Sequence, residues 1–102
     1  MSRVSELEAE RDATLSRMEQ DYRARQEAVA QDKEEIKSRA EEKHQAGEDI
    51  SKEQQDYLDK QHVEDRNYYE YDENRTEVWE HYSSEIENAK QEEATQEEDY
   101  GY

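Results

Sequence analysis

Residues 45–54 read QAGEDISKEQ, and they contain Gly47, one of only two glycines in a 102-residue chain without proline. Glu, Gln, Ala, Lys and Arg dominate the sequence before and after this stretch, and all five favour helices. Glycine between two such segments indicates a turn. We therefore expect an all-α fold made of a helix over about 5–45, a turn at about 46–49, a helix over about 50–95 and a frayed acidic tail over about 96–102.

Two serines mark where these helices could begin. Ser5-Glu6-Leu7-Glu8 has the pattern of a capping box, and Ser51-Lys52-Glu53-Gln54 has the same pattern after the turn. The sequence therefore predicts Ser5 and Ser51 as the N-terminal caps of the two helices.

Apolar residues form a stripe on each expected helix. Before Gly47 they recur every seven residues, which is typical of one column of a coiled coil. This column consists of Leu15, Tyr22, Val29 and Ile36. After Gly47 the stripe on one helical face is largely aromatic, and we interpret it as the facing side of the same seam: Ile50, Tyr57, Tyr68, Tyr71, Trp79, Tyr82 and Ile86.

The two stripes match in one antiparallel register. Facing residues of an antiparallel pair have a constant sum of residue numbers, and five apolar pairs share the sum 93: Val4–Ala89, Leu7–Ile86, Leu15–Val78, Tyr22–Tyr71 and Ile36–Tyr57. This agreement favours two long helices in an antiparallel coiled-coil hairpin. One continuous helix in a parallel dimer remains the alternative, because a single glycine inside a helix costs only ~1 kcal/mol.

The chain has little apolar surface to bury. Only ten residues are Leu, Ile or Val, none is Phe, and 44% of the residues are charged. Burial of ten aliphatic side chains at ~1.5–3 kcal/mol each is small against a backbone entropy of ~1–2 kcal/mol per ordered residue. We therefore expect marginal stability as a monomer, with order completed by a homodimer or by another partner.

The net charge of −17 is concentrated after the turn. Residues 1–50 contribute −5 and residues 51–102 contribute −12. Five glutamates at helical spacing lie opposite the aromatic stripe, and we call them the acidic ridge: Glu70, Glu73, Glu77, Glu80 and Glu87. Tyr69 lies on neither the aromatic stripe nor the ridge, so we expect its ring to be exposed.

Motifs for catalysis and metal binding are weak. Glu41 and His44 form Glu-x-x-His, and Asp59 and His62 form its Asp variant, but a metal site needs further ligands that converge. The chain contains no cysteine and no glycine-rich phosphate loop. We expect no enzyme activity, no cofactor and no metal. The absence of a long apolar run predicts a cytoplasmic protein without contact to a membrane.

The charge density approaches that of nucleic acid. Spread over a hairpin of ~65 Å, −17 gives one net charge per ~4 Å, and a side-by-side dimer would reach ~2 Å, against ~1.7 Å for duplex DNA. Residues 64–102 hold fourteen acids and three bases among several tyrosines. In this character the chain resembles phage-encoded acidic DNA mimics of the anti-restriction and anti-CRISPR type.

The resemblance implies an inhibitor that occupies a basic, nucleic-acid-binding surface of a target protein and does not bind nucleic acid itself. The residues expected to meet that partner are Tyr69, Glu70, Glu73, Glu77, Glu80 and Glu87. The alternative from another class is a structural coiled coil for assembly or scaffolding, and a halophilic source is a further explanation of the acidity.

Overall fold

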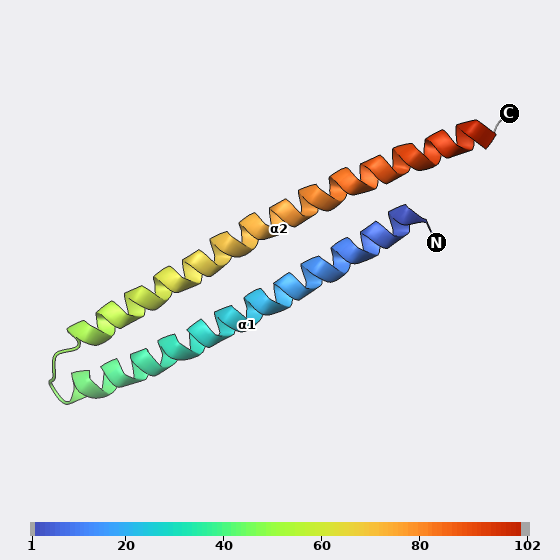
Figure 1. Cartoon of the computed structure of the whole chain (residues 1–102). Helices are drawn as coiled ribbons and strands as arrows, with labels where there is room; N and C mark the ends of the chain where they lie inside the picture. The colour runs from blue at the N-terminus through green and yellow to red at the C-terminus, as the bar shows by residue number, and fades with distance from the viewer. Residues whose placement is uncertain (1, 101–102) are drawn as a thin grey trace. The chain divides into compact units, whose positions relative to one another are not determined.

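The computed structural model describes the backbone of residues 2–100 and the side chains of residues 2–96. The fold is all-α, and its two long helices, α1 (Arg3–Gln45) and α2 (Ser51–Tyr100), pack antiparallel (Figure 1). The predicted hairpin is confirmed, and the alternative of one continuous helix is wrong. The helix α2 extends five residues beyond its expected end. The expected fraying of 96–102 falls largely outside the described side chains and stays a prediction.

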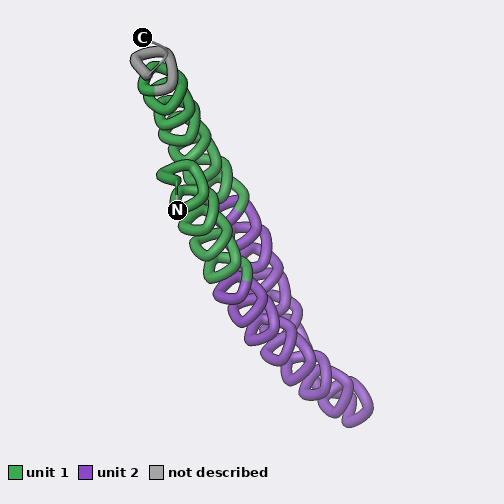
Figure 2. The backbone as a smooth tube through the Cα atoms, turned by 90° about the vertical axis from the view of Figure 1, so that its right-hand side faces the viewer, with its two compact units in different colours: residues 1–19, 72–102 green, residues 20–71 purple. Residues whose placement is uncertain are grey.

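The chain divides into two compact units, which Figure 2 colours separately. Unit 1 combines Met1–Glu19 with Asp72–Tyr102, and unit 2 is the continuous segment Gln20–Tyr71. Each unit therefore contains a piece of both helices, and only unit 2 contains the turn.

Gly47 ends α1 in unit 2. Its φ of +74° is in the left-handed region that glycine adopts readily. The Gly47 N–H donates to the His44 carbonyl at 3.0 Å, and the Glu48 N–H donates to the Lys43 carbonyl at 2.8 Å. These two bonds form a Schellman motif, which satisfies carbonyls that the end of a helix leaves open.

The helix α2 begins through Asp49. Its Oδ1 accepts hydrogen bonds from the Ser51 N–H at 3.2 Å and from the Ser51 hydroxyl at 2.7 Å. These bonds lower the pKa of Asp49, because they stabilise the ionised carboxylate. The predicted cap at Ser51 is therefore wrong. Ser51 is the first helical residue, and Asp49 captures its N–H in an Asx turn.

The predicted cap at Ser5 is also wrong. Ser2 takes that role one turn earlier, since its Oγ accepts a hydrogen bond from the Ser5 N–H at 3.1 Å. The Ser2 carbonyl accepts the first helical bond, from the Glu6 N–H at 3.2 Å. A serine at either position has the chemistry of a cap, and the structure uses the earlier one.

The predicted register is confirmed in each unit. In unit 2 the rings of Tyr22 and Tyr71 stack with centroids 4.4 Å apart and planes within 11°. In unit 1 the buried cluster contains Leu7, Ile86 and Ala89, with Val4 and Tyr82 packed against it. Two pairs with the predicted sum of 93, Leu7–Ile86 and Val4–Ala89, meet in this cluster.

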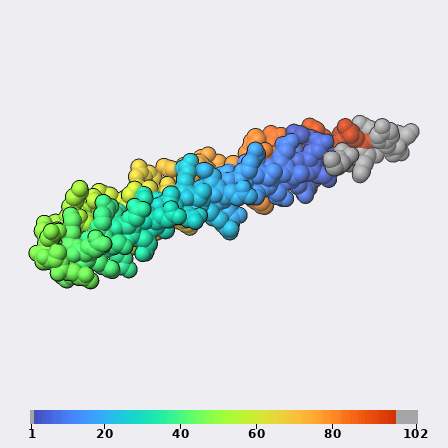
Figure 3. All heavy atoms as spheres, turned by 90° about the horizontal axis from the view of Figure 1, so that it is seen from below, coloured from blue at the N-terminus to red at the C-terminus, as the bar shows by residue number. Residues whose placement is uncertain are grey.

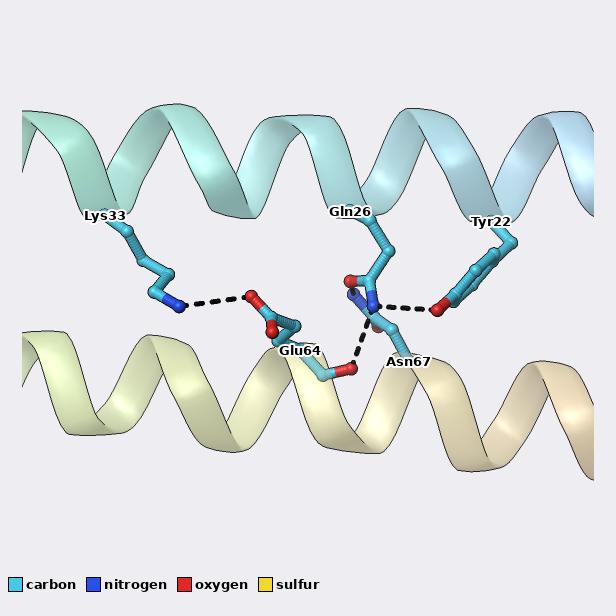
Figure 4. A network of polar contacts seen from close by, with 5 residues as sticks. All are labelled: Tyr22, Gln26, Lys33, Glu64 and Asn67. Carbon is cyan, nitrogen blue, oxygen red and sulfur yellow. Dashed lines mark hydrogen bonds and ion pairs between the residues drawn. The ribbon is translucent and has the colours of Figure 1, made fainter.

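Polar side chains occupy the middle of the unit 2 seam (Figure 4). Gln26 Nε2 donates to the Tyr22 hydroxyl at 3.2 Å and to the Glu64 carbonyl at 3.1 Å. Asn67 Nδ2 donates to Gln26 Oε1 at 3.2 Å, and Lys33 Nζ donates to Glu64 Oε2 at 3.2 Å. The network joins the two helices through polar side chains of both.

An ion pair between half-exposed Lys43 and buried Glu53 lies close to the turn in unit 2. The side chain of Glu53 is 6% exposed, and its Oε1 accepts a hydrogen bond from Lys43 Nζ. Its other oxygen, Oε2, is buried without a hydrogen-bond partner among the described residues. The bond to Lys43 lowers the pKa of Glu53, and the same contact raises the pKa of Lys43.

Replacement of Gly47 by alanine should destabilise the hairpin, because a Cβ is disfavoured at φ +74° although no atom lies within 4 Å of it. We expect a loss of ~1–2 kcal/mol. At about 4–8 °C per kcal/mol this is a clear fall of the melting temperature, measurable by circular dichroism. Asparagine enters the left-handed region more easily, so Gly47→Asn should lose less stability than Gly47→Ala. Equal stability of Gly47→Ala and the parent would contradict the assigned turn.

The Lys43–Glu53 pair should make stability depend on pH in a defined sense. The lowered pKa of Glu53 stabilises the fold above its ordinary value of 4.5, and this part is lost as pH falls through the folded pKa. The raised pKa of Lys43 stabilises the fold below 10.5, and this part is lost as pH rises through the folded pKa. Glu53→Gln should therefore lower the melting temperature most between these limits and least in acid.

The matched control for this titration is Glu41→Gln, which changes an exposed glutamate of the same unit. It should leave the pH profile of the melting temperature close to that of the parent. A Glu53→Gln variant whose deficit is the same at acid and neutral pH would show that the ion pair is not the cause.

Candidate functional site

All five members of the acidic ridge are exposed. Glu70 belongs to unit 2, and the other four, Glu73, Glu77, Glu80 and Glu87, belong to unit 1. None of the five takes part in an ion pair within the part of the chain that the structure describes. Their carboxylates are therefore exposed, without a cationic partner among the described residues.

Three acidic residues of unit 2, unlike those of the ridge, form ion pairs with the opposite helix. Three ion pairs join α1 to α2 there: Lys33–Glu64 at 3.2 Å, Lys60–Asp32 at 2.9 Å and Lys43–Glu53. In sequence, unit 2 contains 15 acids and 9 bases, for a net charge of −6, and unit 1 contains 16 acids and 5 bases, for −11. The excess negative charge is therefore concentrated in unit 1.

Tyr69 is exposed, as predicted. Its side chain has 70% of its surface accessible, the highest value among the large hydrophobic residues that are exposed in the described chain. The ring of Tyr68 lies edge-on to it, with centroids 5.7 Å apart and planes at 72°. The two rings form a small aromatic surface on unit 2.

The predicted burial of Tyr68 and Trp79 in the seam is wrong, because they are 52% and 50% exposed. Both are displaced around α2 from Tyr71, which faces Tyr22. Tyr68 precedes Tyr71 by three residues and Trp79 follows it by eight, which rotates them by ~60° and ~80° to the same flank. Two helices that pack closely have no room between them for rings at these angles.

Arg11 covers one side of the exposed indole in unit 1. Its guanidinium carbon lies 4.6 Å from the centroid of the Trp79 ring, which is the geometry of a cation–π contact. Nothing in the sequence identified Trp79 as the partner of Arg11. An open groove beside Arg11 is lined by Leu15, Arg75, Thr76 and Trp79.

Leu58 is a further exposed apolar residue, at 48%. Its position on α2 explains the exposure. It follows Tyr57 by one residue, a rotation of ~100° away from the seam. In the space-filling view of Figure 3, α1 covers most of the face shown, and the middle of α2 emerges along one edge.

The two motifs with histidine remain separate. His44 is exposed on α1 and His62 is exposed on α2, and their numbers do not match the register. Among the described residues, no group of three or more His, Asp or Glu side chains is placed to hold a metal ion.

No helix within the described range has the length and apolar character required to cross a membrane. Comparison with family models, with curated proteins and with solved structures finds no match to the chain.

The contact between Arg11 and Trp79 can be measured through fluorescence, because Trp79 is the only tryptophan in the chain. Arg11→Ala should increase quenching of the indole by acrylamide and lower stability by ~0.5–1 kcal/mol. Arg17→Ala, which changes an exposed arginine of the same helix, is the control and should change neither. Unaltered quenching in Arg11→Ala would contradict the contact.

Proposed function

We propose that the chain is a non-enzymatic acidic binding protein that occupies a basic, nucleic-acid-binding surface of a target protein, in the manner of a DNA mimic. The observation that supports this function best is the acidic ridge, whose carboxylates are exposed and unpaired in the described structure. A carboxylate without an internal partner keeps its charge available for arginine and lysine of another molecule. Neither a cofactor nor direct binding of nucleic acid belongs to this function.

The charge density of unit 1 supports the same proposal. Its part of α2 spans 29 residues, or ~43 Å at 1.5 Å per residue. A net charge of −11 over this length is one charge per ~4 Å, compared with ~1.7 Å in duplex DNA. A basic cleft that releases counterions on binding DNA would release them for this surface as well, at a lower density.

Tyr69 is the aromatic member of the residues proposed to meet the partner, and it belongs to unit 2. Tyrosine is enriched at the energetic centres of protein interfaces, because its ring buries a large area and its hydroxyl retains a hydrogen bond. With Glu70 beside it in sequence, it offers an aromatic contact next to a charged one. The six residues proposed to meet the partner are Tyr69 and the five glutamates of the ridge.

A structural role in assembly is the second candidate function. The half-exposed rings of Tyr68 and Trp79, together with Leu58, are the observation that favours it. Such side chains are suited to contacts between copies of a coiled coil, and the expected homodimer belongs to this candidate. Sedimentation that shows one defined oligomer, dependent on these three side chains, would support it.

Charge reversal tests the proposed inhibitor. The immobilised chain is incubated with a lysate of its host, and the recovered protein is purified and titrated with duplex DNA in the presence of the chain. The quadruple variant Glu70→Lys, Glu73→Lys, Glu77→Lys and Glu80→Lys should bind that protein at least about tenfold more weakly (~1.4 kcal/mol) and no longer compete with DNA.

The matched control reverses four exposed glutamates of unit 2, Glu27, Glu34, Glu41 and Glu42. It carries the same change of net charge and should compete with DNA more strongly than the ridge variant. Binding of the parent should weaken steeply between about 50 and 200 mM salt. Equal affinity of the parent and the ridge variant would exclude the proposal, and recovery of the chain alone would favour assembly.

A further inference from the structure

The acidic ridge does not explain the groove of unit 1 that Trp79 lines. Leu15 and Trp79 give it an apolar lining, and Thr76 and Arg75 border it on α2. Leu15 is half-buried, and Trp79 retains half of its surface. An apolar hollow beside a half-exposed indole can receive a side chain from another molecule.

The two arginines at the groove are already paired. Arg11 Nε donates to Asp12 Oδ1 at 3.0 Å, and Arg75 Nη2 donates to Asp72 Oδ1 at 2.8 Å. The positive charge beside the indole is therefore neutralised within the chain. Arg11 also shows that the indole accepts a guanidinium against its ring.

Exposed carboxylates lie near one side of the groove, on α2. Glu73 precedes Thr76 by three residues, and Glu77 and Glu80 directly follow Thr76 and Trp79. The groove therefore lies within unit 1, which carries a net charge of −11. This charge favours an occupant that combines an apolar side chain with positive charge.

A second copy of the chain does not fit this description. It would place a second unit 1, with a net charge of −11, against the first. Like charges that meet at an interface cost several kcal/mol. A basic segment gains from the same field. Charge complementarity thus selects the occupant.

We propose that this groove anchors a basic segment of the partner, in which one large apolar side chain inserts between Leu15 and Trp79 while flanking arginines or lysines meet the nearby carboxylates. The inference rests on the proposed function and deepens it, because it adds an apolar anchor to a contact otherwise made by charge. Buried anchors of this kind carry much of the binding energy of interfaces.

Two synthetic peptides test the anchor. One has four arginines on each side of a central leucine, and the other has glycine in place of the leucine. Titration followed by calorimetry and by Trp79 emission should give the leucine peptide an affinity about tenfold higher, as expected for burial of most of a leucine side chain. Its binding should also shift the emission of Trp79 to shorter wavelength.

Two variants locate the effect. Trp79→Ala removes the indole, and Thr76→Gln places a longer neutral side chain over the groove from an exposed helical position. Each variant should bind the leucine peptide and the glycine peptide with the same affinity. Because Thr76→Gln alters no buried side chain, it keeps the test valid if Trp79→Ala loses structure.

The outcomes separate the groove from the general function. Equal affinity of the two peptides for the parent chain would overturn the proposal that the groove anchors an apolar side chain. If both peptides then bind in a salt-sensitive way, the proposed charged contact surface would still stand. The proposed anchor is also overturned if the Thr76→Gln variant still binds the leucine peptide more tightly than the glycine peptide. A dimer that forms in the parent and is absent in Trp79→Ala would assign the groove to a second copy instead. Preference for leucine with no competition against DNA would support the groove and reject DNA mimicry.

Discussion

The left-handed backbone at Gly47 is the constraint that makes antiparallel packing of α1 and α2 possible. At a φ of +74° the residue cannot continue α1, and the Schellman bonds satisfy the carbonyls of His44 and Lys43. Only two residues further on, Asp49 captures the N–H of Ser51 and starts α2. So short a connection also determines the register, because it leaves no slack by which one helix could slide along the other.

A pair of helices has one seam, and this chain has few apolar residues to fill it. Unit 2 compensates with hydrogen bonds from Gln26 and Asn67 and with the pair Lys33–Glu64 across the seam (Figure 4). Polar groups in a seam specify alignment more than they stabilise, since a shift of register would leave them unsatisfied. The network therefore secures the register that the short turn establishes.

Sequence spacing predicted the fold, the register and the exposure of Tyr69, because helical geometry repeats and a constant residue sum tests it. The same spacing failed for Tyr68 and Trp79, since it assigns rings to a face without regard to the narrow gap between two close-packed helices. It also failed for the caps, where Ser2 and Asp49 offered the same chemistry as Ser5 and Ser51 at neighbouring positions. The partner of Arg11 depends on contact across the seam, which no pattern along one helix contains.

Stability and charge are distributed unequally between the two units. Cross-helix ion pairs hold acids of unit 2, whereas unit 1 has an apolar cluster at Leu7, Ile86 and Ala89 and a row of unpaired glutamates. Glu73 and Glu77 are four residues apart, and like charges at this spacing weaken a helix. A basic partner would remove that repulsion at the moment it binds. On the proposed function, the carboxylates that weaken free α2 are therefore the groups through which a target would stabilise it, and recognition and helix stability are one linked equilibrium.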